Sequence, residues 1–331
     1  MYKLEDIKSI HLEVTTKCQA KCPMCARRIN GGPLLDGLVL DEITEEKFKK
    51  WFSIDFIKQL WHLNMCGNLG DPIIAKDTLE IYQYLRRYNK TMGLTMHTNG
   101  SGRVAQWWRD LAKVDVVSAF ALDGLEDTHA RYRVNTNWNK IIENAQTFIE
   151  AGGNARWDMI VFQHNEHQIE DCRALSKKLG FKEFQVKHTT RFRDGKFDVV
   201  DENYNKVDTL YPSKKSLEMI EPMEKAREEK LPKITCKAVE DHMLYVSAYG
   251  NVSPCCWLDL KWVPQIHPSR IDYMIKVGRY PNLHDESLED VFNSGYFTKI
   301  SNCWNTTGLK ECSKQCGSFD KLNEQFVERG Q

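Results

Sequence analysis

Three cysteines are crowded into one short stretch near the N-terminus of the 331-residue chain. Cys18, Cys22 and Cys25 follow the spacing CxxxCxxC. A structural zinc site takes four ligands, usually from two CxxC-type pairs, so this group is one thiol short. A [4Fe–4S] cluster held by only three cysteines keeps one iron open for an external ligand. The spacing therefore favours an iron–sulfur centre, with a zinc site or three unrelated core thiols as the alternatives.

The segments around this motif predict the elements that must position it. Short apolar runs alternate with longer helical patterns up to about residue 188. The expected strands are 9–15, 60–66, 93–100, 114–124, 156–162 and 181–188, and the expected helices are 44–60 (one helix or two short ones), 79–88, 104–112, 139–153 and 168–180. This order predicts an α/β protein with a parallel sheet, open or curled into a partial (β/α)6 TIM-like barrel. Ligand chemistry on such folds collects where strands end, and the cysteines directly follow the first expected strand.

Four more polar or glycine-rich motifs come at the ends of later strands. They are CGNLGDP (66–72), HTNGS (97–101), FALDGLEDTHARYR (120–133) and VFQHNE (161–166). Taken one at a time, the Gly–Pro and Asp–Gly combinations indicate ordinary turns. Their common position at the ends of successive strands indicates instead that they surround a ligand pocket.

Together with the cysteine group, these motifs resemble the radical S-adenosylmethionine (radical SAM) enzymes. In that family, the amine and carboxylate of SAM chelate the open iron. An electron from the cluster cleaves SAM to methionine and a 5′-deoxyadenosyl radical, which abstracts hydrogen from the substrate. The resemblance implies that Cys18, Cys22 and Cys25 hold this [4Fe–4S] cluster. It also implies SAM as a cofactor and an electron donor such as flavodoxin or ferredoxin.

The same resemblance implies a set of SAM contacts. CGNLGDP stands where the family has its GGEP-like segment, whose carbonyls and polar side chain accept hydrogen bonds from the SAM amine. Asp71 replaces the usual Glu there, and Ala121 replaces a serine that can contact the SAM ribose. The implied cofactor-binding residues are Gly67, Asn68, Gly70, Asp71, Thr98, Asn99, Asp123, Arg133 and Asn165, and His129 belongs to the same motif as Asp123. No residue is assigned a catalytic role.

Six of the eleven cysteines come after residue 235. Cys236, Gly250 and Cys255 fit the C-x(9–15)-G-x(4)-C element of the SPASM and twitch domains, which carry auxiliary iron–sulfur clusters in radical SAM enzymes. A later C-x(2)-C-x(5)-C-x(3)-C pattern is incomplete, because Thr306 stands at one of its cysteine positions. The resemblance therefore implies one auxiliary [4Fe–4S] cluster, with the ligands Cys236, Cys255, Cys312 and Cys316 and with Cys303 in reserve as the alternative to Cys312.

These assignments divide the chain into three segments. Residues 1–190 are expected to form the radical SAM core, 191–235 a linker or bridging helix, and 236–331 a small twitch- or SPASM-like auxiliary domain. Residues 191–214 are polar and irregular, 216–232 are expected to form a charged helix, and an apolar helix is expected within 286–300. The remaining thiols are interpreted as buried or spare, namely Cys66, Cys172 and Cys256.

The overall composition bears on the partners of the protein and on its cellular compartment. The chain has 46 basic and 46 acidic residues, so no net charge points to nucleic acid or to an anionic membrane. No run of about 18 apolar residues is present, which argues against a transmembrane helix. The N-terminus lacks the apolar core of a signal peptide. A cytoplasmic protein is the simplest expectation, and clustered cysteines in a reducing compartment point to metal before disulfides.

The sequence leaves the substrate open. SPASM and twitch relatives act on peptides, protein side chains and small sugar-like or nucleoside-like metabolites, so a peptide or small-molecule substrate is expected. A radical SAM enzyme that modifies nucleic acids or nucleosides is the alternative, although the neutral charge does not favour it. A non-catalytic zinc-binding module would explain the cysteines but not the order of the motifs at the strand ends.

Overall fold

The computed structural model describes residues 3–192, 194–227, 234–259, 268–305, 309–317 and 327–329. The chain forms two compact parts. The first part comprises Met1–Lys17, Asp36–Leu94 and Glu229–Asp320, and the second comprises Cys18–Leu35, Thr95–Glu228 and Lys321–Gln331. Each part therefore combines segments that are far apart in the sequence.

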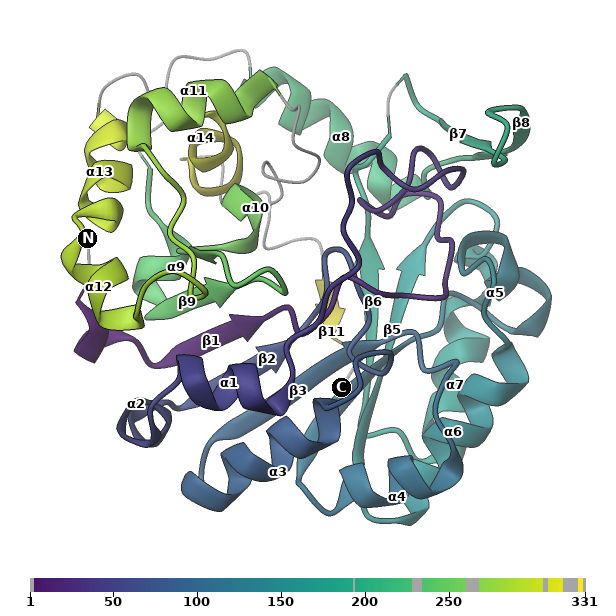
Figure 1. The fold of residues 1–331 in the computed structure, drawn as a ribbon. Helices are drawn as coiled ribbons and strands as arrows, with labels where there is room; N and C mark the ends of the chain where they lie inside the picture. Colours follow the sequence, from purple (N-terminus) through teal and green to yellow (C-terminus); the bar gives the residue numbers. More distant parts are fainter. Residues whose placement is uncertain are drawn as a thin grey trace. The chain divides into compact units, whose positions relative to one another are not determined.

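Strands β10, β9, β1 and β2 lie side by side in that order in the first part (Figure 1). β1 (Ser9–Leu12) pairs in parallel with β2 (His62–Met65) at one edge and with β9 (Met243–Val246) at the other. β10 (Val252–Ser253) pairs antiparallel with β9. β1 and β2 lie within predicted strands, whereas the sequence analysis does not predict β9. This strand attaches a segment from the last third of the chain directly to the first strand.

Helices α1 (Glu45–Trp51), α2 (Ile54–Gln59) and α3 (Thr78–Tyr88) pack together in the first part. The pattern over 44–60 forms two helices because the Ser53 side chain accepts the Phe56 N–H at 3.2 Å and starts α2 there. Phe48 and Phe52 are fully buried beneath these helices, with ring centroids 4.8 Å apart.

The C-terminal segment of the first part consists of short helices. Their bounds are α9 (Lys237–Glu240), α10 (Cys256–Asp259), α11 (Pro268–Val277), α12 (Leu288–Asn293), α13 (Tyr296–Asn302) and α14 (Lys310–Cys316), with the 3-10 turn η3 (Cys303–Asn305). At the N-terminal end of the same part, the 3-10 turn η1 (Leu4–Asp6) precedes β1. The single helix expected within 286–300 is instead α12 and α13. Gly295 separates them with a φ of +75°, a left-handed conformation that glycine adopts without strain.

The second part contains the later βα units. β4 (Val116–Ala121), β5 (Asn154–Val161) and β6 (Glu183–His188) pair in parallel, and β11 (Val327–Arg329) pairs antiparallel with β6. β3 (Gly93–Thr98) begins in the first part and ends in the second. The helices of this part are α4 (Ala105–Ala112), α5 (Glu126–Tyr132), α6 (Trp138–Glu150) and α7 (Ile169–Leu179), with the 3-10 turn η2 (Glu166–Gln168) (Figure 1). The predicted α/β class, with parallel strands and consecutive βα units, is confirmed.

The irregular stretch expected after residue 190 contains regular structure. β7 (Phe197–Val200) and β8 (Lys206–Leu210) form an antiparallel hairpin within 191–214, and α8 (Lys214–Arg227) follows where a charged helix is expected at 216–232. β7 has the sequence FDVV and β8 has the sequence KVDTL, and neither short strand shows the alternation of apolar and polar residues by which strands are identified in a sequence. Arg131 of α5 holds β8 through Asp208 at 2.8 Å, a contact that no local pattern shows.

Large aromatic side chains fill the core of the second part. Trp108, Phe120, Phe148 and Trp157 are fully buried, and the Trp108 and Phe120 ring centroids lie 5.1 Å apart. Burial of side chains of this size is a dominant source of core stability. Across the described residues, no helix combines the length and the apolar character needed to cross a bilayer.

Candidate functional site

The loop 18–35, which carries the CxxxCxxC motif, is fixed by hydrogen bonds to its own backbone. The Cys25 N–H donates to the Cys22 carbonyl at 3.0 Å, which folds the second half of the motif into a turn. Arg27 Nη1 donates to the Cys18 carbonyl at 2.7 Å and spans the whole motif. The three thiols are therefore presented on one ordered loop rather than on a regular element.

The environment of these thiols is largely apolar. Cys22 is buried, and Cys18 and Cys25 pack against the same apolar cluster. The buried members of that cluster are Ala20, Cys22, Met24, Tyr132, Phe162, Phe192, Val199 and Leu210. Burial raises the pKa of the Cys22 thiol to about 11. A positive counter-charge is therefore needed to stabilise the thiolate, which is the form that binds metal.

Arg133 supplies a positive charge at this position. Its Nη1 lies 3.8 Å from Cys22 Sγ, and its Nε donates to Asp123 Oδ2 at 2.5 Å. Asp123 is fully buried, and its other oxygen accepts the Ile160 N–H at 2.6 Å. Burial raises the pKa of Asp123, and the guanidinium opposes this effect. The chain thus places one fixed, oriented cation beside the most buried of the three thiols.

Asn99, from the HTNGS motif, contacts another of the three thiols. Its Nδ2 lies 3.7 Å from Cys18 Sγ, and its Oδ1 accepts from Gln19 Nε2 at 2.8 Å. Thr98 holds the same turn, because its Oγ1 accepts the Gly100 N–H at 3.0 Å. The sequence analysis does not single out Gln19, although its place directly after Cys18 is a signal that could have indicated it.

Two further polar residues brace the strand ends. His129 is buried, its Nδ1 accepts the Asp123 N–H at 3.2 Å, and burial lowers its pKa to about 3, so the ring is neutral. Asn165 Nδ2 donates to the carbonyls of Asp123 at 3.1 Å and Ile160 at 3.0 Å. Asn165 Oδ1 accepts the N–H of Phe162 at 2.7 Å. Both side chains thereby fix the backbone that carries Asp123.

Replacing Arg133 with methionine removes the cation but keeps much of the apolar volume. Because Asp123 would remain as an uncompensated charge in a fully buried position, we expect the free energy of unfolding to fall by about 3–5 kcal/mol. Anaerobic urea unfolding followed by circular dichroism measures this loss. The matched control is Arg131→Met, whose ion pair with Asp208 lies at the surface with both side chains partly exposed, and it should cost less than about 1 kcal/mol. Equal losses in the two variants would contradict the buried-pair interpretation.

The GGEP-like loop lies in the first part. A Cβ on Gly67 would come within 2.0 Å of the Gly70 carbonyl oxygen, and one on Gly70 within 1.8 Å of the Thr15 carbonyl oxygen. Asp71 is buried, its N–H donates to the Lys17 carbonyl at 2.9 Å, and its Oδ1 accepts the Ile73 N–H at 3.2 Å. The two glycines therefore allow a tightly folded loop in which backbone atoms approach each other more closely than any side chain would permit.

Asn68 in the same loop carries a donor that could serve a ligand. Its Nδ2 is buried with no nitrogen or oxygen partner within the described residues, and the Cys256 thiol is the one polar group among them that interacts with this side chain. A buried donor of this kind costs free energy unless a bound molecule completes it. The loop is therefore compatible with a polar ligand such as SAM.

The structure thus gathers the sequence-predicted residues into two sets. In the second part, Cys18, Cys22 and Cys25 are joined by Thr98, Asn99, Asp123, Arg133 and Asn165. In the first part, Gly67, Asn68, Gly70 and Asp71 form one loop.

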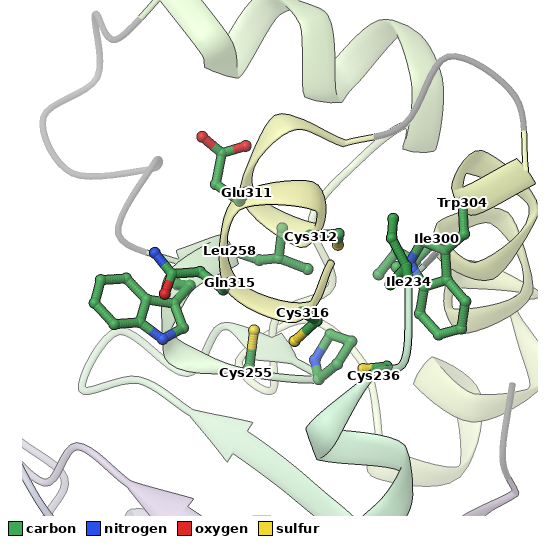
Figure 2. A pocket seen from close by; sticks show the side chains of 12 residues that line it. Ile234, Cys236, Cys255, Leu258, Ile300, Trp304, Glu311, Cys312, Gln315 and Cys316 are labelled. Carbon is green, nitrogen blue, oxygen red and sulfur yellow. The ribbon is translucent and has the colours of Figure 1, made fainter. Parts of the chain in front are cut away.

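The C-terminal cysteines meet in a pocket of the first part. Cys236, Cys255, Cys312 and Cys316 all line it, and Figure 2 shows the sulfur atoms of Cys255 and Cys316 facing each other. Cys312 and Cys316 lie four positions apart on α14, which places them on the same face of that helix. The hydrogen bond with Cys316, together with burial, raises the pKa of Cys236, and burial raises the pKa of Cys255 to about 11.

Cys303 has a different environment from these four thiols. It does not line the pocket, and its Sγ donates to the Lys299 carbonyl at 3.2 Å at the end of α13. The three thiols interpreted as spare also lie outside the pocket lining, and Cys172 is completely buried in α7. All eleven cysteines are free thiols. The geometry therefore favours Cys312 over Cys303 as the fourth member of the group.

The pocket suits an iron–sulfur cluster chemically. Four thiols complete the cysteine ligation of a [4Fe–4S] cluster, and its other walls are largely apolar, including Ile234, Leu258 and Ile300. Trp304 also lines the pocket, and its indole N–H points to the Cys312 thiol, where it opposes the rise that burial gives to the pKa of that thiol. Hydrogen bonds to cluster sulfur are a usual role for such a donor. Among the described residues, no three His, Cys, Asp or Glu side chains converge as ligands of a single metal ion.

Comparison with known families assigns the class. A model of the radical SAM superfamily matches residues 12–175, and a model of the iron-sulfur cluster-binding domain SPASM matches residues 236–317. The chain belongs to the radical SAM superfamily and carries a SPASM domain. It is a radical SAM enzyme whose cofactors are SAM and [4Fe–4S] clusters. No curated protein matches the chain.

Solved structures share this fold. SuiB of Streptococcus suis bound to S-adenosylmethionine has a TM-score of 0.61 and 14% identity, over 96% of this chain and 75% of SuiB. The anSMEcpe protein with bound AdoMet has a TM-score of 0.59 and 15% identity, over 97% of this chain and 92% of that one. SuiB bound to its precursor peptide SuiA has a TM-score of 0.56 and 15% identity, over 96% and 73%. At these identities, the likeness shows the shared fold.

Proposed function

We propose that this enzyme reductively cleaves SAM and uses the resulting 5′-deoxyadenosyl radical to abstract a hydrogen atom from a peptide. The observation that carries the chemistry is the loop of Cys18, Cys22 and Cys25, which offers three thiols and no fourth cysteine. A cluster held in this way supplies an electron to SAM bound at its open iron. In the protein's own fold, Arg133 and Asn99 already contact Cys22 and Cys18.

The chain's own contributions to this site are charge and orientation. Arg133 offsets the negative charge that builds up at Cys22, and Asn99 orients a donor at Cys18. The proposed SAM contacts are Gly67, Asn68, Gly70, Asp71, Thr98, Asn99, Asp123, Arg133 and Asn165. Asp123 and Asn165 also brace the backbone, so their role in SAM binding includes fixing the position of Arg133.

One auxiliary [4Fe–4S] cluster is proposed in the C-terminal pocket, with Cys236, Cys255, Cys312 and Cys316 as ligands. Because four cysteines complete its ligation, this cluster serves structure or electron transfer and does not bind substrate at iron. The proposed division of the chain is 1–190 for the radical SAM core, 191–235 for the bridging segment and 236–331 for the auxiliary domain. A flavodoxin or ferredoxin is the proposed electron donor, and the free thiols support a reducing, cytosolic setting.

The peptide assignment is supported by the fold shared with SuiB, which has been solved with its precursor peptide. The chain's equal numbers of acidic and basic residues give no electrostatic reason to choose a nucleic acid instead. A small-metabolite substrate is the other outcome that the experiment below distinguishes.

Deuterium transfer tests this function. Extract from cells grown on deuterated medium is divided into peptide, metabolite and RNA fractions, and each is incubated anaerobically with reduced enzyme and SAM. We expect deuterium in 5′-deoxyadenosine from the peptide fraction only, and its loss when that fraction is first treated with protease. Transfer from the metabolite fraction or from ribonuclease-sensitive material would overturn the peptide assignment. Absence of 5′-deoxyadenosine from the iron-loaded enzyme in every fraction would overturn the radical chemistry.

A further inference from the structure

Three buried polar side chains form a continuous chain of hydrogen bonds in the first part. Glu13 follows β1, Tyr245 lies in β9, and Asp259 ends α10, and all three are at most 1% exposed. The Tyr245 hydroxyl donates to Glu13 Oε2 and lies 3.3 Å from Asp259 Oδ2. Asn251 Nδ2 holds the other Asp259 oxygen at 3.1 Å. Buried polar networks are retained only when their members are satisfied, as they are here.

One end of this network holds the GGEP-like loop. Glu13 Oε1 accepts the N–H of Leu69, the central residue of the Gly67–Asp71 loop. That loop lies against the strand end so closely that Gly70 has no room for a side chain. A single carboxylate therefore fixes the backbone of the loop from inside the protein.

The other end reaches the lining of the cysteine pocket. Asp259 is the last residue of α10, which begins at Cys256, directly after the pocket-lining Cys255. Leu258, on the same short helix, also lines the pocket. α10 is only one turn long, so a single helical turn separates Cys255 from Asp259.

The network must also contain a shared proton. A tyrosine hydroxyl has one proton to donate, yet two carboxyl groups lie within hydrogen-bonding distance of it. Burial raises the pKa of Glu13 and of Asp259 to about 7 each, which favours a proton on one of them. The link therefore remains hydrogen-bonded along its whole length without two unpaired buried charges.

We propose that Glu13, Tyr245 and Asp259 are positioning residues that couple the Gly67–Asp71 loop to the Cys255 segment, so that an occupied auxiliary pocket and SAM binding strengthen each other. The inference rests on the proposed function, in which that loop contacts SAM and Cys255 holds the auxiliary cluster. Coupling of this kind is reciprocal, because each ligand changes the affinity for the other by the same factor.

The experiment measures the dissociation constant of SAM by equilibrium dialysis against the anaerobic, cluster-loaded protein. Cys255→Ala removes the auxiliary cluster, and Tyr245→Phe removes only the hydroxyl that joins the two carboxyl groups. We expect Cys255→Ala to weaken SAM binding about tenfold in the wild-type background and less than about twofold when Tyr245→Phe is also present. The matched control is Tyr249→Phe, whose hydroxyl donates to the Val39 carbonyl outside the network, and it should keep the tenfold effect.

Amide hydrogen exchange gives a readout that does not depend on activity. Loss of the auxiliary cluster should speed exchange of the Leu69 N–H in the wild-type protein, because its acceptor Glu13 is no longer held through Tyr245. In Tyr245→Phe, this N–H should exchange fast whether or not the cluster is present. Glu13→Gln is the second variant: its amide oxygen keeps an acceptor for Leu69 and its amide N–H donates to the Tyr245 hydroxyl, so the chain of hydrogen bonds and the tenfold effect should both persist.

The outcomes separate this inference from the proposed function. An undiminished tenfold effect in Tyr245→Phe would overturn the coupling and leave the enzyme assignment intact. The same holds if Cys255→Ala loses the cluster but binds SAM as tightly as the wild type. A wild-type protein that binds no SAM, or that carries no second cluster, would overturn both.

Discussion

Alanine at Cys18, Cys22 and Cys25 together is expected to abolish formation of 5′-deoxyadenosine and to leave about half of the iron. The three thiols lie on one loop and are the proposed ligands of the cluster that binds SAM. Their removal should lower the iron content from about eight to about four atoms per chain, because a [4Fe–4S] cluster in the C-terminal pocket has its own four cysteines. Iron analysis and chromatography of the products after anaerobic reduction measure both effects.

Cys172→Ala is the matched control for the triple variant. This thiol is also buried, but it lies in α7 outside both cysteine groups. It should keep the full iron content and the rate of SAM cleavage, since a cysteine-to-alanine change in a core typically affects stability rather than chemistry. Unchanged 5′-deoxyadenosine production in the triple variant would refute the assignment of the loop.

Cys255→Ala is expected to lose one whole cluster, whereas Cys303→Ala should retain both. Cys255 lines the pocket together with the other three proposed ligands, and deleting one of four ligands leaves the cluster with an open iron in an apolar pocket. We expect a loss of about four irons per chain and of the corresponding half of the visible absorbance. The remaining cluster should still show the changed electron paramagnetic resonance spectrum that accompanies SAM binding.

Cys303 provides the comparison within the same segment. Its thiol is directed to a backbone carbonyl of its own helix, so its removal should cost only a weak hydrogen bond. Cys303→Ala is therefore expected to bind iron and to cleave SAM as the wild type does. Loss of about four irons in this variant, with retention in Cys312→Ala, would exchange the two residues in the ligand set.

Much of the fold could be predicted from the sequence, because the βα units carry strong local signals. Apolar runs such as RWDMIVF and SIHLEVT alternate with long helical patterns. In each segment, the spacing of the apolar residues alone indicates whether it forms a strand or a helix and which side is buried. Gly180, which ends α7 with a φ of +87°, is a similar local signal. These segments form strands and helices at the predicted places.

The elements that the sequence analysis missed depend on partners far away in the chain. β9 is a strand because β1 offers it a free edge, and a four-residue apolar run alone does not distinguish this from a helix. The short β7–β8 hairpin is held through contacts such as that between Arg131 and Asp208. The division of 286–300 into two helices turns on Gly295, whose left-handed backbone is visible only in the structure.

The candidate site shows the same limit. Cysteine spacing identified the thiols, since metal ligation imposes residue types at fixed intervals. The side chains next to those thiols could not be identified in the same way. Gln19 and Trp304 belong to no motif, and only their neighbours in the structure connect them with the cysteines. Glu13 did carry a signal, as a charged residue within the apolar stretch SIHLEVT, and such a residue is rarely buried without a partner.

The pairing of β9 with β1 has a consequence for dissecting the protein. Ser9 to Leu12 register with Met243 to Val246, so one whole edge of the first strand is covered by residues from the SPASM segment. A chain truncated before residue 236 would expose a row of unpaired main-chain N–H and C=O groups at that edge. Exposed edges of this kind pair readily with other chains and cause aggregation. The fragment 1–235 is therefore a poor candidate for expression as a separate soluble protein, although it contains all the motifs of the radical SAM core.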